Sequence, residues 1–235
     1  MLYIIGLGLN LKGASLEALD AISEADLVYL ENYTVDFPYS ENELEKELGV
    51  KIFSADRNFV ENMEDLIDES KKKKVALLVY GSPLTATTHI SLIEEAEKKG
   101  VKVKVIYAAS VFDAVAETGL QLYKFGKIAS MPKFPAESYL EIVAANKKIK
   151  AHSLILIDIG MELNDAIERL SSDCKNKKIK LDKIVVCSRL GTSEAEIVYG
   201  NLKDLIKLEI KKPFCIIIPG EMHFLEKEVL ENFNK

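Results

Sequence analysis

The stretch Val75-Ala76-Leu77-Leu78-Val79-Tyr80-Gly81-Ser82-Pro83 decides the fold of this chain. A continuous run of apolar residues is typical of a strand that is covered on both faces of a sheet. Glycine and proline then end the strand, and an amphipathic helical pattern begins near Ile90. The stretch therefore predicts a strand, a tight turn and a helix of an α/β sheet. Open α/β sheets bind ligands at the carboxyl ends of their strands, so the turn at Gly81 is a candidate site.

Similar apolar runs recur along the chain and alternate with helical patterns, which predicts mainly parallel sheets. The length of 235 residues suits two compact α/β lobes, and we place their boundary between residues 1–109 and 110–235. Gly100 is the expected C′ residue after a helix over Ser91–Lys99. The expected strands are Leu2–Ile5, Leu27–Leu30, Val75–Tyr80, Val103–Tyr107, Leu154–Ile159, Ile184–Cys187 and Phe214–Ile218. The expected helix stripes are Leu16, Leu19 and Ile22 after the N-cap Ser15, and Phe59, Met63, Leu66 and Ile67.

Composition excludes several classes of function. The formal charge of −6 argues against a broad electrostatic grip on nucleic acid. No apolar run approaches the roughly 18 residues that span a bilayer, and the start of the chain lacks a basic leader, so we expect a cytoplasmic protein without membrane contact. The three cysteines, an odd number with no C-x-x-C spacing, predict free thiols and no metal site.

The segment Gly6-Leu7-Gly8 follows the first expected strand and permits close backbone approach to a ligand. One interpretation is a dinucleotide loop with Glu31 as the ribose-binding acid. The third glycine of that motif is missing, because position 11 is Leu, and the next helix begins only near Ser15. The dinucleotide interpretation is therefore the weaker one.

Five segments together resemble the diphthine synthases, which belong to the tetrapyrrole-methylase superfamily. The resemblance covers nearly the whole chain, and its most specific part is the Tyr-Lys-Phe-Gly stretch at residues 123–126. The segments are Ile5-Gly6-Leu7-Gly8-Leu9, Glu31-Asn32-Tyr33-Thr34, the turn from Gly81 to His89, Ser110 to Gly126 with Phe134-Pro135 and Ser138-Tyr139 just after, and Arg189-Leu190-Gly191-Thr192 with Pro219-Gly220-Glu221-Met222-His223.

The resemblance implies two α/β lobes with a cofactor cleft between them, a homodimer, and S-adenosyl-L-methionine as the cofactor, released as S-adenosyl-L-homocysteine. The implied substrate is translation elongation factor 2, whose modified histidine carries a 3-amino-3-carboxypropyl group. Its amino group would be methylated in steps to a trimethylammonium, and the compact organisation is similar to archaeal members. Carried over by position, the cofactor contacts fall at Leu9, Ser82, Thr85, Ser110, Val111, Ile157, Leu190 and Phe214.

Three of these positions depart from the family pattern. The family commonly has Asp at the position of Ser82, often Val at Thr85, and often His at Phe214. The lost carboxylate matters most, because a hydroxyl offers a hydrogen bond without charge attraction to a sulfonium or amino group. A charge-assisted contact of about 1.5–3 kcal/mol would be worth one to two orders of magnitude in cofactor affinity.

The remaining polar candidates have open interpretations. His89 would either relay a proton at the mouth of the cleft or bond the adjacent lobe, and His223 would either touch the cofactor or stabilise the last helix. His152 is expected to be exposed. Asp158 either holds the turn before Gly160 or faces the cleft, and the structural role is favoured. On the substrate side, the candidates are Tyr33, Tyr123 and Lys124.

No catalytic base is assigned, because methyl transfer from a sulfonium needs mainly placement and a neutral amine. Two rival functions remain. One is an enzyme of the same fold that acts on a tetrapyrrole or on ribosomal RNA, against which the Tyr-Lys-Phe-Gly stretch argues. The other is a protein that docks on the elongation factor without catalysis, which the serine at position 82 motivates.

Overall fold

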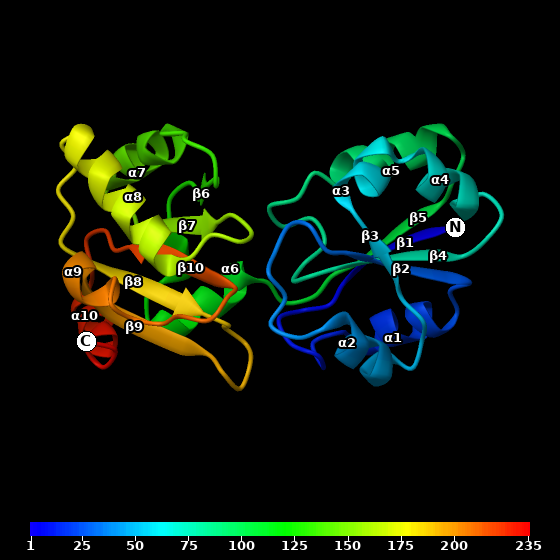
Figure 1. The fold of residues 1–235 in the computed structure, drawn as a ribbon, viewed down its shortest axis with the longest axis horizontal. Coiled ribbons are helices and arrows are strands. Elements are labelled where there is room, and N and C mark those ends of the chain that lie inside the picture. Colours follow the sequence, from blue (N-terminus) through cyan, green and yellow to red (C-terminus); the bar gives the residue numbers. More distant parts are fainter. The chain divides into compact units, whose positions relative to one another are not determined.

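The computed structural model describes residues 1–235 and divides into two compact units, Met1–Val111 and Phe112–Lys235. Each unit contains one five-stranded sheet with helices packed against it (Figure 1). This arrangement confirms the α/β class. No helix has the length and apolar character needed to cross a membrane.

The sheet of the first unit is parallel throughout, with strand order β3-β2-β4-β1-β5. Every residue of β1 and β4 is buried, as the apolar runs predict. Figure 1 shows α1 and α2 on one face of this sheet and α3, α4 and α5 on the other. The strands are β1 (Leu2–Gly6), β2 (Leu27–Glu31), β3 (Phe53–Ala55), β4 (Val75–Val79) and β5 (Val103–Ile106), and the helices are α1 (Leu16–Ser23), α2 (Glu41–Leu48), α3 (Arg57–Asn62), α4 (Glu64–Ser70) and α5 (Ile90–Lys98).

The sheet of the second unit has the order β6-β7-β10-β8-β9. Only β6 and β7 pair in parallel; β10 runs antiparallel to both β7 and β8, and β9 runs antiparallel to β8. The strands are β6 (Ala129–Met131), β7 (Ser153–Ile157), β8 (Lys183–Ser188), β9 (Glu196–Asn201) and β10 (Phe214–Ile218). Its helices are α7 (Ser138–Lys148), α8 (Leu163–Asn176), α9 (Leu202–Leu205) and α10 (Phe224–Glu231), preceded by α6 (Val111–Ala114) and the short 3₁₀ segments Val115–Thr118 and Leu122–Lys124.

The expectation of parallel strands thus holds for the first sheet but not for most of the second. The short loop between β8 and β9 forms a hairpin, and a hairpin joins only antiparallel strands. All seven expected strands are present. The three strands that the sequence did not predict, β3, β6 and β9, lie at sheet edges, where one side is unpaired and the apolar signal is weaker.

Helix α1 begins where expected, since the Ser15 hydroxyl accepts a hydrogen bond from the Ala18 N–H at 3.1 Å. The predicted stripe is right at Ile22 but wrong at Leu16 and Leu19. Leu16 is 81% exposed and Leu19 is 40% exposed, and the face toward the sheet is formed by Ala18, Ala21 and Ile22. Small alanine side chains let this helix lie close to the sheet.

The expected helix through Met63 is divided into α3 and α4. Met63 has a left-handed backbone, with φ of 60°, which breaks the helical hydrogen-bond ladder. The end of α5 follows the prediction, because Gly100 has φ of 77° directly after the C-cap Lys99. The three cysteines are free and buried.

Candidate functional site at the strand ends

The loops after β1 and β4 meet backbone to backbone. Gly8 and Gly81 exchange two hydrogen bonds, with the Gly8 N–H 3.2 Å from the Gly81 oxygen and the Gly81 N–H 2.9 Å from the Gly8 oxygen. A Cβ on Gly6 would lie 2.6 Å from the Gly81 oxygen, so only glycine fits there. Both strands are parallel neighbours, and their carboxyl ends therefore form one edge of the sheet.

Five of the eight expected cofactor residues gather at this edge. Leu9 is buried, and its carbonyl accepts a hydrogen bond from the Tyr80 hydroxyl at 3.1 Å. Ser82 and Thr85 form one turn, in which the Thr85 N–H donates to the Ser82 oxygen at 3.1 Å. The remaining two, Ser110 and Val111, follow β5, the other neighbour of β1.

The Ser110 side of the edge approaches the Gly81 turn closely. A Cβ on Gly81 would lie 3.8 Å from the Ser110 Cα, and Ser110 itself is buried. Gly81 has φ of 71°, a conformation that a side chain would strain. The three loops after β4, β1 and β5 therefore lie close together at one edge of the sheet.

The other three expected residues gather at one edge of the second sheet. Ile157 ends β7, Leu190 follows β8, and Phe214 begins β10, which lies between these two strands and runs opposite to both. The start of β10 is thus at the same edge as the ends of β7 and β8. The Arg189 N–H donates to the Pro213 oxygen at 2.9 Å and closes this corner.

The donor set at these positions suits an adenosyl and amino-acid ligand. Ser82, Thr85 and Ser110 supply hydroxyls, the loops supply backbone groups, and the other positions are apolar. Such a mixture of apolar walls with a few polar groups is typical of small-molecule sites. None of the eight positions carries a charge, so a sulfonium or amino group would be held there without a carboxylate partner. No group of three or more His, Cys, Asp or Glu side chains is arranged to hold a metal ion.

His89 is buried inside the first unit, and its ring contacts two groups of that unit. It is 2% exposed, its Nδ1 lies 2.9 Å from the Pro83 oxygen, and its Nε2 lies 3.5 Å from the carboxylate of Glu31. Glu31 is equally buried, and burial raises the pKa of its carboxyl, opposed by Thr34, His89 and backbone N–H groups. A carboxylate held against His89 inside the unit is not available to a ribose, which removes the basis of the dinucleotide interpretation.

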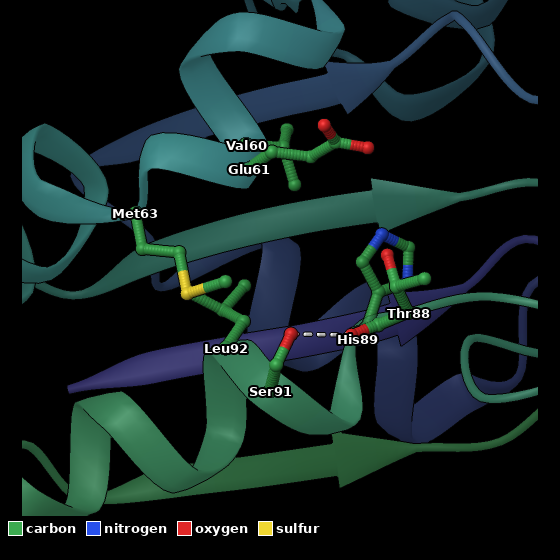
Figure 2. A pocket seen from close by; sticks show the side chains of 7 residues that line it. All are labelled: Val60, Glu61, Met63, Thr88, His89, Ser91 and Leu92. Carbon is green, nitrogen blue, oxygen red and sulfur yellow. Dashed lines mark hydrogen bonds between the residues drawn. The ribbon is translucent and has the colours of Figure 1, made fainter.

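A hollow of about 220 Å³ adjoins His89 on the side of α3 and α5 (Figure 2). It is separate from the Ser82 turn and lies wholly in the first unit. Two of its lining residues are joined by a hydrogen bond, which the Ser91 hydroxyl donates to the Thr88 oxygen at 2.7 Å. The lining residues are Val60, Glu61, Met63, Thr88, His89, Ser91 and Leu92.

His152 is completely buried, so the expectation that it is exposed is wrong. The Gly220 N–H lies 2.8 Å from its Nδ1, and its Nε2 lies 3.1 Å from a carboxylate oxygen of Glu226. An N–H group only donates, so Nδ1 accepts and the proton of the neutral ring is on Nε2, pointing at Glu226. Burial lowers the pKa of His152, in keeping with a neutral ring.

Glu226 is the polar centre of the second unit, and the sequence reasoning missed it. Its carboxylate accepts hydrogen bonds from the Gln121 N–H at 2.9 Å, the His223 N–H at 2.6 Å, His152 and Lys124. Burial raises the pKa of Glu226, but these donors outweigh it and lower the pKa to about 2. The sequence does contain a signal for Glu226. It lies three residues after His223, at the N3 position of the last helix, where Glu completes a capping box.

The other polar candidates have mainly structural contacts. Lys124 donates to Glu226 and, at 2.7 Å, to the Glu221 oxygen, while Tyr123 is 81% exposed. The favoured structural role of Asp158 is confirmed, because it accepts from the Lys133 N–H at 2.8 Å and from the Ile159 N–H at 3.0 Å.

Two further candidates complete this group. The backbone of His223 caps the last helix through Glu226, which supports its structural interpretation. Tyr33 is half-buried under the guanidinium of Arg57, and burial raises the pKa of its hydroxyl to about 12.

The strand-end loops and the two-sheet fold agree with comparisons to known proteins. A family described as tetrapyrrole (corrin/porphyrin) methylases matches residues 1–206, and the chain belongs to it. The class that fold and family define is therefore that of methyltransferases.

More specific relatives match almost end to end. The diphthine synthase of Methanocaldococcus jannaschii is 37% identical over 98% of each chain. A protein of Arabidopsis thaliana named probable diphthine methyl ester synthase is 37% identical over 98% of this chain and 97% of its own. A crystal structure of a diphthine synthase matches with a TM-score of 0.92 at 35% identity, over 99% of this chain and 95% of that one. Within the methylases, the chain is a member of the diphthine synthase family.

Proposed function

We propose that this protein methylates the amino group of the 3-amino-3-carboxypropyl-histidine of translation elongation factor 2, with S-adenosyl-L-methionine as the methyl donor. The reaction is a step of diphthamide biosynthesis. The full-length similarity to diphthine synthases carries the proposal. The gathering of Leu9, Ser82, Thr85, Ser110 and Val111 at one sheet edge supports the cofactor assignment.

The proposed cofactor contacts are the five residues at the edge of the first sheet together with Ile157, Leu190 and Phe214. When bound, S-adenosyl-L-methionine supplies an electrophilic methyl group and leaves as S-adenosyl-L-homocysteine. The backbone groups around Gly8 and Gly81 are fixed by their mutual hydrogen bonds, so they are already oriented before a ligand arrives. The hydroxyls of Ser82 and Ser110 add hydrogen bonds to the polar end of the ligand.

No side chain is assigned as a general base. His89 is engaged with the Pro83 carbonyl and Glu31, and His152 is engaged with Gly220 and Glu226. Neither buried ring is placed to take a proton from a substrate amine. We propose that the amine loses its proton to water and that the protein contributes placement of the nucleophile.

The partner and the setting follow from the same assignment. We propose a cytoplasmic homodimer of archaeal type that takes the folded elongation factor as its protein substrate. The charge of −6 supports a role without nucleic-acid binding. We propose three successive transfers to a trimethylammonium product, although relatives bear both diphthine synthase and diphthine methyl ester synthase names.

Mass spectrometry tests the proposal directly. The cognate elongation factor carrying the unmethylated intermediate is incubated with the protein and S-adenosyl-L-methionine, and the histidine peptide is weighed over time. Stepwise gains of one methyl mass, up to three, are expected, and a fourth would indicate ester formation. Reactions without cofactor are the control. Absence of any gain while the cofactor binds would contradict the proposed substrate, and absence of both would favour the non-catalytic docking protein.

A further inference from the structure

The turn that carries Ser82 and Thr85 is held through one carbonyl. The Pro83 oxygen accepts a hydrogen bond from the Thr87 hydroxyl at 2.8 Å and a second from His89 Nδ1 at 2.9 Å. Ala86 has φ of 57°, so the chain reverses between these donors and the carbonyl. The two side chains close the loop after Pro83 onto the turn itself.

The contact to Pro83 determines where His89 carries its proton. A carbonyl oxygen only accepts, so Nδ1 is protonated and Nε2 is the atom that faces Glu31. Two proton arrangements make the 3.5 Å separation between His89 Nε2 and the Glu31 carboxyl oxygen favourable. Either a His89 imidazolium lies beside a Glu31 carboxylate, or a neutral His89 ring lies beside a protonated Glu31 carboxyl. A neutral ring beside a carboxylate would place a lone pair against a negative charge. Glu31 and His89 therefore share one proton beyond the one on Nδ1.

Glu31 connects this pair to the rigid part of the unit. It is the last residue of β2, and β2 pairs with β4, the strand that enters the Ser82 turn. Leu30 is paired with Leu78 in this register, so Glu31 lies beside the end of β4. His89 is the N-cap residue of α5, where the loop after the turn ends. The pair thus bridges the sheet and the end of the turn-bearing loop, inside the protein.

We propose that Glu31 and His89 are positioning residues for methyl-donor binding, acting through the Pro83 carbonyl on the turn of Ser82 and Thr85. This inference rests on the proposed function. The pair does not touch the substrate. It holds the turn in the shape that presents its hydroxyls and backbone groups to the ligand.

Two substitutions at His89 separate the two contacts of its ring. In His89→Asn the side-chain amide overlays the position of Nδ1 and keeps a donor for Pro83, whereas in His89→Gln it overlays Nε2 and keeps a partner for Glu31 only. Loss of one buried hydrogen bond to the turn corresponds to about 3- to 10-fold in affinity. We expect the Kd for S-adenosyl-L-methionine, measured by calorimetry, to rise by about that factor in His89→Gln and by less in His89→Asn.

Further readouts distinguish positioning from general stability. At saturating cofactor, the kcat of His89→Gln should remain within about 2-fold of the native value, while the KM for the cofactor rises with the Kd. Thr87→Val removes the second donor to the same carbonyl from a partly exposed position, and it should weaken cofactor binding by about 3- to 10-fold as well. The control Ser91→Ala removes an exposed hydroxyl beside the same hollow and should leave the Kd within about 2-fold.

Two results would overturn the inference: an unchanged Kd in His89→Gln, or equal weakening in His89→Asn and His89→Gln. Failure of the proposed function is recognised separately, because the native protein would then neither bind S-adenosyl-L-methionine nor methylate the elongation factor. If a His89 variant does not fold, Thr87→Val tests the contact to the Pro83 carbonyl by itself. An unchanged Kd for S-adenosyl-L-methionine in that variant then overturns the inference.

Discussion

Replacing Glu226 by glutamine removes a charge from the buried centre of the second unit without changing its shape. The side chain of Glu226 has no exposed surface. One carboxylate oxygen accepts from the Gln121 N–H and His152, and the other accepts from the His223 N–H and Lys124. In glutamine, one of these oxygens becomes an NH₂ group, so two donors face another donor.

The loss of stability in Glu226→Gln depends on which of the two carboxylate oxygens becomes the NH₂ group. At the position shared by Lys124 and His223 the damage is smaller, because Lys124 is partly exposed and keeps the Glu221 oxygen. An unsatisfied buried donor costs about 1–3 kcal/mol, so we expect Glu226→Gln to lower the free energy of unfolding by roughly 2–4 kcal/mol. This corresponds to a fall in Tm of roughly 5–12 °C.

Urea unfolding at pH 7, followed by circular dichroism, measures the change. The matched control is Glu228→Gln, which removes the same charge from an exposed position on the same helix and should change stability by less than about 0.5 kcal/mol. A Glu226→Gln variant as stable as this control would refute the reasoning that the carboxylate is the acceptor for four donors.

The pH dependence gives a second check on Glu226. Its folded pKa of about 2 lies below the ordinary value of 4.5, so the unfolded chain binds the proton more readily. The stabilisation from the ionised carboxylate is therefore present above about pH 4.5 and is lost as the pH falls toward 2. The difference in stability between the native protein and Glu226→Gln should narrow over that interval. A constant difference would contradict the assigned pKa.

Three further predictions concern the cofactor turn, a glycine and the thiols. Ser82→Asp should tighten S-adenosyl-L-methionine binding by about 10-fold or more in calorimetry, because a carboxylate adds charge attraction, whereas Ser82→Asn should not; equal affinities would mean that this position acts through its backbone. Gly220→Ala should lower the free energy of unfolding by about 3 kcal/mol or more, because its Cβ would lie 2.4 Å from the Lys150 oxygen, whereas Gly49→Ala, with open space around it, should cost about 1 kcal/mol in the same urea titration. The buried thiols should react with a disulfide reagent only after unfolding, because the hydrogen bond between Cys187 and Cys215 and burial raise the pKa of Cys187, and burial raises that of Cys174 to about 11; fast labelling of the native protein would contradict this burial.

The sequence predicted the central strands well. Leu2–Ile5 and Val75–Tyr80 are continuous apolar runs, and the corresponding strands β1 and β4 are buried on both faces in the middle of a parallel sheet. A strand that is buried on both faces is apolar at every position, so a short segment of sequence is enough to identify it. The same reasoning placed the turn at Gly81 at a strand end, and the family resemblance named the residues around it.

Strand direction and helix faces depended on more distant partners. Strand β10 lies between β7 and β8 and runs antiparallel to both. The residues Phe214–Ile218 do not indicate which strands will lie beside them, so the sequence could not predict this direction. The exposed Leu16 in α1 shows the same limit, because a leucine on a helical stripe has the same local pattern whether or not a sheet covers it.

The sequence by itself therefore determined the α/β class, the core strands, the glycine turn and the family. Only the tertiary structure decided the states of the buried histidines. His89 donates from Nδ1 to a carbonyl of its own loop, and His152 accepts at Nδ1 from Gly220, which makes the two rings opposite in proton placement. The partner carboxylates, Glu31 and Glu226, lie 58 and 74 positions away along the chain. A charge or tautomer is set by whichever groups surround it in space, and folding alone brings those groups together.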